Sequence, residues 1–264
     1  MKKVGIVGCG NLGSALLKGF RAQYPELKII ASKRNLTQDQ LKSTDENTIF
    51  TTDNEYLLAN CEIIIIALKP YNLLDFLAKY KGSIDPSKHT LVSVVTGIAT
   101  SEMMQSLEND ALSMYRAMPN TAADVQQSMT AISGLLHDPL NRKQEIEELF
   151  KAVGEIVWID EQLMESATIL GACGIAYVLR FIRAMIQGGI EVGFDAKTAN
   201  TIVNQTVKGA AELLIRNGSH PEAEIDKVTT PKGVTIVGLN EMEHSGFSSA
   251  LIKGIVTSYQ KIEK

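Results

Sequence analysis

Three glycines near the start of the sequence have a spacing that suits phosphate binding. Gly8, Gly10 and Gly13 form the pattern G-x-G-x-x-G within VGIVGCGNLGSALLKGF, where an apolar run gives way to a helical pattern. The first glycine permits a tight turn, the second lets a pyrophosphate approach the backbone, and the third lets helix and strand pack closely. The helix N-terminus adds free N–H groups and a partial positive charge. We therefore predict that these glycines, with Asn11 and Leu12, bind the phosphates of a dinucleotide.

The residues after the next apolar run indicate which dinucleotide binds. Glycines also serve ordinary turns, but a position between a predicted strand and a predicted helix favours the dinucleotide. Enzymes that use NAD usually place an acidic residue after the second strand, whereas enzymes that use NADP need donors and positive charge there. Here Ser32, Lys33, Arg34 and Asn35 follow the run, without an acidic residue. This favours NADPH, with NADH as the other possibility, and leaves open that the four residues form only a solvated turn.

The elements that must hold these residues alternate between strands and helices. Apolar, β-rich runs predict five strands, separated by helical patterns; the runs are KVGIVG, KIIAS, EIIIIAL, TLVSVV and LSMYRAM. Such runs are typical of a parallel sheet between layers of helices. From about Met164 the pattern is long, Ala-rich and apolar at helical spacing, with NG at 217–218 ending one helix. We predict an α/β, Rossmann-like dinucleotide-binding domain over residues 1–160 and an all-α domain over residues 161–264.

Composition and charge exclude several classes of protein. The chain has 264 residues, of which 45% are hydrophobic and 21% are charged, as is average for folded, soluble proteins. The formal net charge is −4 and the lysines and arginines are scattered, so we expect no nucleic-acid partner. Purely apolar runs such as IIIIAL fall far short of the ~20 residues that cross a membrane. The glycines near the N-terminus do not fit a signal peptide.

The cysteines form no pattern for a metal or a disulfide framework. Cys9, Cys61 and Cys173 are far apart, with no C-x-x-C pair and no nearby pair of histidines. We therefore expect no metal site and a reducing, cytoplasmic location. Cys173 lies beside Gly174 and Ala176 and is interpreted as a small packing residue rather than a nucleophile.

Several separate motifs, in order along the chain, resemble those of the 1-pyrroline-5-carboxylate reductase family, which catalyses the last step of proline synthesis. GIVGCGNLGSALLKGF resembles the opening of that family, and ALKPYNL resembles its A-V-K-P segment beside the cofactor. MPNT resembles its loop near the nicotinamide, and GIAYV and GGIEVGF resemble its long interface helices. HPEAEIDKVTTPKGVTIVGLNEMEHSGF, residues 220–247, resembles the family signature. The resemblance covers essentially the whole chain.

The resemblance implies further residues of the cofactor and substrate sites. Asn54 stands where the family has an asparagine that faces the adenosine ribose. The other residues implied at the cofactor are Ala67, Lys69, Pro70, Met118 and Asn120. Those implied at the substrate are Lys232, Gly233, Val234 and Thr235. The hydroxyl of Thr235 is implied to contact the ring nitrogen of the substrate, as the catalytic residue, and backbone N–H groups after TTPKG suit the substrate carboxylate.

Two motifs depart from the family pattern. The usual G-S-G-P-A-Y becomes ACGIAY from Ala172 to Tyr177, without the serine and the proline. The usual S-P-G-G-T-T becomes TPKGVT from Thr230 to Thr235, with Lys232 in place of a glycine. The amine of Lys232 either adds a charge partner for the substrate carboxylate or points outward, and a positive φ there would strain a lysine. The departures bear on fine substrate preference more than on reaction type.

The expected function is reduction of the C=N bond of 1-pyrroline-5-carboxylate to L-proline, with hydride from NADPH. A protonated cyclic imine is already electrophilic, so the protein must supply orientation and a carboxylate site rather than a metal or a covalent nucleophile. One alternative is another NADP-dependent imine or β-hydroxyacid oxidoreductase on the same two-domain plan, although GACGIAY lacks the lysine expected of the latter family. A second alternative is a regulator that binds NADPH without catalysis, which the intact frame VTTPKGVTIVGL opposes.

The helices of the second domain predict the assembly of two chains. The stretches from Glu165 to Gly193 and from Lys197 to Asn217 carry apolar residues on more than one face, which must be buried. A second copy can supply the missing surface, as the resemblance also implies, so we expect a homodimer or a larger homo-oligomer built from it. Each site would then combine the nucleotide-binding domain of one chain with TTPKGVT of the same or the other chain.

Overall fold

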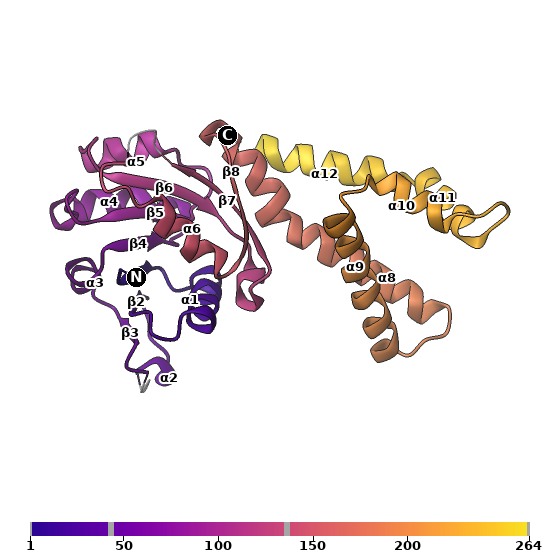
Figure 1. Cartoon of the computed structure of the whole chain (residues 1–264), viewed down its shortest axis with the longest axis horizontal. Helices are drawn as coiled ribbons and strands as arrows, with labels where there is room; N and C mark the ends of the chain where they lie inside the picture. The colour runs from indigo at the N-terminus through magenta and orange to yellow at the C-terminus, as the bar shows by residue number, and fades with distance from the viewer. Residues whose placement is uncertain (1, 42–44, 135–137, 263–264) are drawn as a thin grey trace. The chain divides into compact units, whose positions relative to one another are not determined.

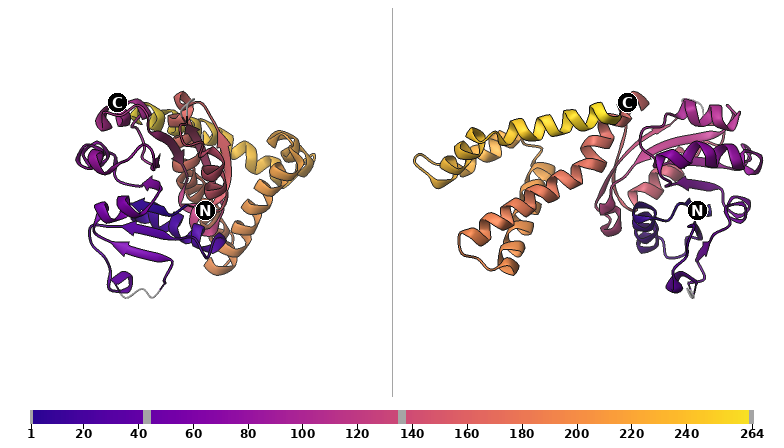
Figure 2. Two further views of the ribbon diagram at one scale, coloured as in Figure 1. Left: turned by 60° about the vertical axis from the view of Figure 1, so that its left-hand side comes forward. Right: turned by 180° about the vertical axis from the view of Figure 1, so that it is seen from behind.

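The protein folds as two compact units. The computed structural model describes residues 2–41, 45–134 and 138–262. The first unit contains the residues up to Cys173 and a short C-terminal segment from Tyr259, and the second runs from Gly174 to Ser258. Figures 1 and 2 show a sheet between helices in the first unit and helices alone in the second. The predicted fold class, a Rossmann-like α/β domain followed by a helical domain, is confirmed.

Within the described residues, eight strands form one sheet in the order β3-β2-β1-β4-β5-β6-β7-β8. They are β1 (Val4–Val7), β2 (Ile29–Ser32), β3 (Thr48–Thr51), β4 (Ile63–Ile66), β5 (Thr90–Ser93), β6 (Ser113–Met118), β7 (Ser128–Gly134) and β8 (Gly154–Trp158). The first six strands are parallel, and the strand order reverses between β1 and β4. All five predicted strands are present. The sheet is not wholly parallel, because β7 runs antiparallel to β6.

Helices cover both faces of the sheet because the strands are apolar on both faces. They are α1 (Asn11–Gln23), α2 (Gln38–Leu41), α3 (Asn54–Asn60), α4 (Leu73–Tyr80), α5 (Thr100–Leu107), α6 (Lys143–Lys151) and α7 (Met164–Ala167). Shorter 3₁₀ turns occupy Pro70–Asn72, Lys81–Ser83, Thr121–Val125 and Glu161–Leu163. Ile63 and Ile65 of β4 pack with α1 and α6, whereas Ile64 and Ile66 pack with α3, α4 and α5 on the other face. The period of two along a strand thus divides one apolar run between two cores.

The helical stretch after β8 belongs with the sheet. It consists of the turn Glu161–Leu163, α7 and a π-helical segment, Thr168–Cys173. This stretch packs against β6 and β7, so the first unit continues to Cys173 rather than stopping at the predicted boundary after residue 160. Helical periodicity marks where strands end, but packing decides which core a helix joins.

The second unit is helical and buries little of its apolar surface. It contains α8 (Gly174–Glu191), α9 (Ala196–Asn217), α10 (Pro221–Val228), α11 (Val234–His244) and α12 (Phe247–Ile262), the last of which continues into the C-terminal segment of the first unit. As predicted, α9 ends at the NG pair, with Gly218 at a φ of +61°. The buried core described for this unit consists of Ile186, Ala199 and Val203.

The stretch Glu161–Glu191 is long and apolar enough to cross a membrane by length and composition, although only 11% of its most apolar window is buried within the chain. A single helix of this kind is weak evidence for a membrane span, because apolar helices of soluble proteins pass the same test.

Trp158, the one tryptophan of the chain, packs the edge strand β8 against residues of β6 and α6. Its ring meets Tyr115 of β6 edge-on, with centroids 6.1 Å apart, and the amine of Lys143 lies 4.5 Å from its centroid. The indole N–H donates a hydrogen bond of 2.7 Å to Glu147 Oε1 on α6. A buried or half-buried indole thus has both its ring and its polar atom satisfied.

His89 is a buried residue whose ring links the segment before β5 to α3 by hydrogen bonds. Its Nδ1 accepts a hydrogen bond from the N–H of Asp85 at 2.8 Å, and its Nε2 lies 2.9 Å from the carbonyl oxygen of Leu58. With Nδ1 accepting, the ring is neutral and Nε2 carries the proton that it donates to Leu58. Burial lowers the pKa of His89 below its ordinary value of 6.5. Protonation of Nδ1 would remove the Asp85 bond and bury a charge.

We expect the first unit to lose stability as the pH falls below about 6.5. Because the folded pKa of His89 is lowered, its contribution is fully present above the unfolded value and is lost as the pH falls through the folded value. His89→Gln should lower the free energy of unfolding by about 1–3 kcal/mol at neutral pH and reduce its pH dependence. Urea unfolding of both proteins, followed by circular dichroism between about pH 7.5 and 5.5, measures this. His244→Gln, at an exposed position, is the control; equal pH slopes in wild type and His89→Gln would contradict the prediction.

Candidate active site

The turn between β1 and α1 is shaped by the three glycines of the N-terminal motif. Gly8 has a φ of +92°, and a Cβ added there would lie 2.7 Å from the carbonyl oxygen of Ala67. A Cβ added to Gly13 would lie 2.7 Å from the carbonyl oxygen of Gly8, whereas one added to Gly10 would have no atom within 4 Å. The first and third positions therefore lack room for a side chain, and the second faces open space.

The N-terminus of α1 presents its N–H groups beside this turn. Gly10 caps the helix without a side-chain hydrogen bond, and no acidic residue stands in the first turn. The helical hydrogen bonds begin when the N–H of Ser14 donates to the carbonyl oxygen of Gly10 at 2.8 Å. The N–H groups of Asn11 and Leu12 therefore have no acceptor within the helix and are available to an anion.

A cavity of about 340 Å³ opens at the carboxyl ends of β1, β2, β3 and β4. This is the place where the strand order reverses, at which open α/β sheets bind their ligands. It is lined by Val7, Gly8, Gly10, Ser32, Lys33, Arg34, Asn35, Thr52, Asn54, Ala67, Leu68, Lys69 and Asn72. Most of the residues predicted at the cofactor are thus brought together from the ends of four strands. Four lining residues were not predicted, namely Val7, Thr52, Leu68 and Asn72. Leu68 and Asn72 lie within ALKPYNL but were not singled out there, and Thr52 lies in no quoted motif.

The lining of this cavity favours an anionic ligand. Lys33, Arg34 and Lys69 contribute positive charge, and none of the described residues that line the cavity is acidic. Lys33 and Arg34 directly follow Ser32, the last residue of β2, whose carbonyl oxygen accepts the N–H groups of Gly8 and Cys9 at 3.1 and 2.8 Å. The end of β2 is therefore held against the glycine turn. Open space over Gly10, free N–H groups and clustered cations together fit a dinucleotide phosphate.

The other residues predicted at the cofactor lie outside the cavity lining. Asn11, Leu12, Gly13 and Pro70 flank it in sequence, whereas Met118 is the last residue of β6 and Asn120 lies in the loop after it. Met118 is 2% exposed, and its sulfur lies 3.9 Å from the Oγ1 of Thr96. The amide of Asn120 is used within the protein: Oδ1 accepts the N–H of Ala122 at 3.0 Å, and Nδ2 donates to the carbonyl oxygen of Gly171 at 3.2 Å.

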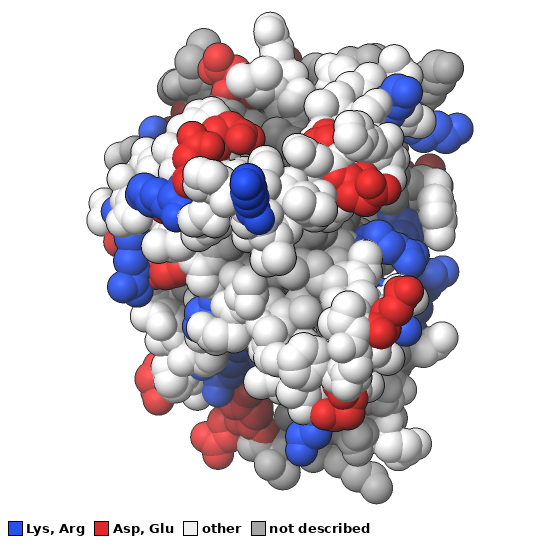
Figure 3. Space-filling model, turned by 90° about the vertical axis from the view of Figure 1, so that its right-hand side faces the viewer, with Lys and Arg blue, Asp and Glu red and all other residues white. Residues whose placement is uncertain are grey.

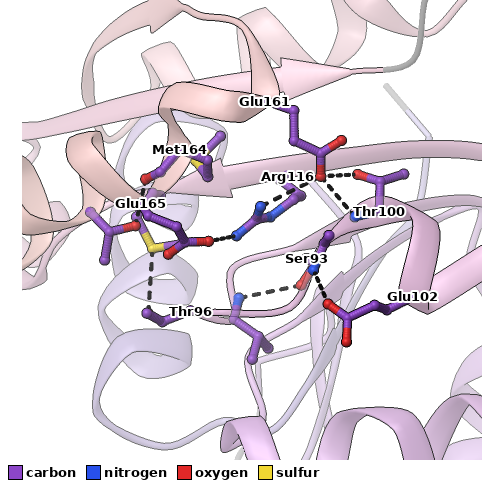
Figure 4. Close-up of polar contacts among 12 residues, drawn as sticks. Ser93, Thr96, Thr100, Glu102, Arg116, Glu161, Met164 and Glu165 are labelled. Carbon is purple, nitrogen blue, oxygen red and sulfur yellow. Dashed lines mark hydrogen bonds and ion pairs between the residues drawn. The ribbon is translucent and has the colours of Figure 1, made fainter. Parts of the chain in front are cut away.

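Sequence reasoning missed a charge cluster beside these two residues, in which a buried arginine contacts two partly exposed carboxylates. Arg116 of β6 is held between Glu161 and Glu165, and Glu161 also contacts Thr100 at the start of α5 (Figure 4). The one available signal was a charged residue in the middle of LSMYRAM, an otherwise largely apolar strand. The partners stand 45 and 49 residues away along the chain, beyond the reach of any local pattern.

The segment predicted to bind substrate forms a tight turn in the second unit. The N–H of Gly233 donates to the carbonyl oxygen of Thr230 at 2.9 Å, which closes a turn over Pro231 and Lys232. Lys232 has a φ of +60°, at the position where turns with a preceding proline normally have glycine. The positive φ considered from the sequence is therefore present, and it costs a lysine on the order of 1 kcal/mol.

The turn leads directly into α11, whose N-terminus is open. Gly233 caps the helix without a side-chain hydrogen bond, and no acidic residue stands in the first turn. Lys232, Val234 and Thr235 are exposed on this unit. A Cβ added to Gly233 would lie 2.6 Å from the Oγ1 of Thr230, so this glycine is needed for the turn.

The thiols of the chain have raised pKa values. Cys9 and Cys61 are buried and Cys173 is half-buried. Burial raises the pKa of all three, to about 12 for Cys61, which keeps them protonated at neutral pH. In the part of the chain that the structure describes, no group of three or more His, Cys, Asp or Glu side chains could hold a metal ion.

Comparison with known proteins identifies the family. Residues 161–264 match a family model described as pyrroline-5-carboxylate reductase dimerisation, and residues 3–97 match one described as NADP oxidoreductase, coenzyme F420-dependent. Pyrroline-5-carboxylate reductase 2 of Dictyostelium discoideum is 40% identical over 278 residues, which cover 100% of this chain and 93% of that protein.

Two further proteins are similar over nearly the whole chain. Pyrroline-5-carboxylate reductase 1 of Dictyostelium discoideum is 44% identical over 98% of this chain, which spans about half of that relative, 49% of its length. The crystal structure of Plasmodium falciparum pyrroline carboxylate reductase with NADP bound has the same fold, with a TM-score of 0.90 at 24% identity, over 99% of this chain and 97% of that one. Motifs, fold and full-length similarity agree, and the chain belongs to the pyrroline-5-carboxylate reductase family.

Proposed function

We propose that the chain reduces the C=N bond of 1-pyrroline-5-carboxylate with NADPH, giving L-proline, as a cytoplasmic homodimer. The observation that carries the proposal is the 40% identity to a pyrroline-5-carboxylate reductase over the full chain. The cavity at the switch between β1 and β4, with its glycine turn and its cations, supports a phosphorylated dinucleotide as the cofactor. When bound, the reduced nicotinamide supplies the hydride that the imine carbon accepts.

The first unit binds and orients the cofactor. The N–H groups at the start of α1 bind the pyrophosphate, and the space over Gly10 lets it approach the backbone. Lys33 and Arg34 bind the 2'-phosphate through charge-assisted hydrogen bonds, and Asn54 faces the adenosine ribose. Lys69, on the other side of the cavity, adds charge from the loop after β4.

The second unit binds the substrate through the turn before α11. The free N–H groups at the start of this helix, from Val234 on, donate hydrogen bonds to the carboxylate, and the amine of Lys232, two residues earlier, adds a positive charge. The Oγ1 of Thr235 accepts the N–H of the protonated imine, which fixes the orientation of the ring. Because the imine enters protonated, hydride addition alone gives the neutral secondary amine, and the residues need only hold and orient the reactants.

One assay tests the proposal directly. Addition of 1-pyrroline-5-carboxylate to the protein and NADPH should cause the loss of NADPH absorbance, with one proline formed for each NADPH consumed. The protein without substrate is the control for NADPH oxidation. Turnover of a β-hydroxyacid with NADP, but not of the imine, would replace the proposal by the β-hydroxyacid alternative. Binding of NADPH with no turnover of either substrate would favour the regulator.

The exposed apolar surface of the second unit supports the dimer. The described core of this unit is only Ile186, Ala199 and Val203, whereas large apolar side chains along α8 and α12 remain exposed, among them Val178, Leu179, Phe181, Phe247, Leu251 and Ile252. An apolar cavity of about 550 Å³ lies between these two helices. Figure 3 shows a broad uncharged area on one face of the molecule, with acidic and basic side chains interspersed around it. Helices this apolar require a second surface, and an isologous dimer supplies it.

We expect Arg34→Ala to weaken NADPH binding more than NADH binding, because only NADPH carries the 2'-phosphate. Loss of a charge-assisted hydrogen bond costs about 1.5–3 kcal/mol, which is a rise of about 10- to 150-fold in the KM for NADPH. Steady-state kinetics with each cofactor measures the two changes. Lys18→Ala removes an exposed cation of the same unit, away from the cavity, and serves as the control. Equal effects of Arg34→Ala on both cofactors would show that Arg34 does not contact the phosphate.

We expect Thr235→Ala to lower turnover by about 2- to 13-fold, the range for one lost hydrogen bond. NADPH binding should not change, because the hydroxyl is proposed to contact the imine nitrogen rather than the cofactor. Stopped-flow turnover and NADPH titration separate the two effects. Thr235→Ser keeps the hydroxyl and is the matched control. Unchanged turnover in Thr235→Ala would contradict a contact between its hydroxyl and the imine, and would assign the residue only a structural role in the first turn of α11.

We expect the active protein to have at least twice the mass of one chain. Light scattering at assay concentration measures the mass, and Phe181→Glu should dissociate the assembly because it places a charge in an apolar interface. Arg183→Glu, two residues along the same helix at an exposed position, introduces the same residue without removing an apolar one. A fully active species with the mass of one chain, 28.8 kDa, would contradict the dimer.

A further inference from the structure

A buried arginine joins the sheet to the helical stretch after β8. The side chain of Arg116 is 2% exposed, and its Nη2 donates to Glu165 Oε1 at 2.7 Å, while its Nη1 lies 3.4 Å from Glu161 Oε1 (Figure 4). The Nε of Arg116 and the Oε2 of Glu165 are buried without a hydrogen-bond partner. The guanidinium thus holds carboxylates from two successive helical turns against the last part of β6.

Glu161 extends this cluster to the loop after β5. Its Oε1 accepts both the N–H and the hydroxyl of Thr100, each at 2.7 Å. Thr100 is the first residue of α5, and the residue before it, Ala99, has no side-chain group that can cap the helix. Within α5, Glu102 accepts the N–H of Ala99 at 3.0 Å, and the carboxylate of the distant Glu161 accepts the next N–H, that of Thr100. The loop 94–99 is held at its far end by Glu161.

The loop after β6 is tied to the same helical stretch. Met118 stands two residues beyond Arg116, and its sulfur contacts Thr96 in the loop after β5. Asn120 donates to the carbonyl oxygen of Gly171 in the π-helical segment. Met118, the last residue of β6, therefore contacts the loop after β5, and Asn120, in the loop after β6, is bonded to the stretch Glu161–Cys173.

Stability alone is a poor reason for this cluster. Removing charges from water costs about as much as a buried ion pair returns, so apolar residues of similar size are often at least as stabilising. What the guanidinium supplies is a planar fork that binds two carboxylates in a defined geometry, which a lysine cannot reproduce. The cluster of Arg116, Glu161 and Glu165 is therefore suited to fixing the positions of the segments that carry these residues.

We infer that Arg116 is a positioning residue, which holds the loops after β5 and β6 in place beneath the nicotinamide of the cofactor. β4, β5 and β6 are parallel, so their carboxyl ends meet at one edge of the sheet. The cavity at the switch holds Lys33 and Arg34 at one end and Lys69, after β4, at the other. A dinucleotide with its adenosine half at Lys33 and Arg34 would extend its nicotinamide half past the end of β4 toward those of β5 and β6. The inference rests on the proposed NADPH-dependent reductase.

Three variants separate positioning from stability. Arg116→Lys keeps the charge but loses the fork. The double variant Arg116→Met with Glu165→Met removes the buried pair and leaves Glu161 on Thr100. Arg142→Lys makes the same exchange at another buried arginine, which lies near the opposite ends of the strands and contacts Glu145 and the carbonyl oxygen of Lys88, and it is the matched control.

Each variant is examined by three measurements, of which the first needs neither cofactor nor substrate. Hydrogen–deuterium exchange of the cofactor-free protein measures the order of residues 94–99 and 118–121. Steady-state kinetics with 1-pyrroline-5-carboxylate measures kcat and the KM for NADPH, and urea midpoints measure stability. In Arg116→Lys and in the double variant, we expect faster exchange in the two loops and unchanged exchange in residues 4–10. We expect kcat to fall by about 10- to 100-fold, as for a small misplacement of reactants, with the KM for NADPH nearly constant. The urea midpoint of the double variant should equal that of the wild type. In Arg142→Lys, hydrogen–deuterium exchange in both loops should be unchanged.

Two results would overturn the inference. The first is unchanged loop exchange and kcat in Arg116→Lys. The second is faster exchange throughout the sheet with a lower urea midpoint, and with kcat and KM changed together, which is the result of a merely structural role. If the wild type fails to reduce the imine, the proposed function fails, and the exchange data on the cofactor-free protein still decide whether Arg116 orders the loops.

Discussion

The turn between β1 and α1 depends on two close backbone contacts, at Gly8 and at Gly13, that leave no room for a side chain. The carbonyl oxygen of Ala67 lies 2.7 Å from the position that a Cβ of Gly8 would take, and the carbonyl oxygen of Gly8 lies 2.7 Å from that of a Cβ on Gly13. β1, β4 and α1 therefore approach one another as bare backbone. This close approach brings the start of α1 to the same cavity as Lys33 and Lys69, which come from different strand ends. A single methyl group at either glycine would separate the helix dipole from the cations that act with it.

The fold of the first unit was largely predictable, because its central strands are short apolar runs between helical patterns. β3, β7 and β8 were missed for physical reasons: β3 and β8 lie at the edges of the sheet and are partly exposed, and β7 consists mostly of small and polar residues. The position at which the sheet unit passes into the helical unit, Cys173, could not be predicted from the sequence. The residues of the stretch Glu161–Cys173 have helical spacing, and nothing in that spacing says that they pack on β6 and β7.

The cofactor cavity was predictable where one local spacing places several groups at one strand end, as with Gly8, Gly10 and the cations after β2. The loop after β6 shows the limit of that reasoning. Asn120 was assigned to the cofactor from the motif MPNT, but both ends of its amide are engaged within the protein, one of them by Gly171. Arg116 meets its carboxylate partners only through the folded chain. Such long-range contacts leave no periodic trace in a single sequence.

Because Trp158 belongs to the sheet unit, the indole fluorescence of the protein reports on that unit alone. The indole is the single one in the sequence, and its ring and N–H contact Tyr115, Lys143 and Glu147, all of the sheet unit. Intrinsic indole emission is therefore a label for β8 and α6, and it changes when this edge of the sheet opens. The helices α8 to α11 contain no indole and contribute instead to the helical ellipticity. Fluorescence and ellipticity thus follow different parts of the same chain, and their transitions coincide only when the two units unfold together.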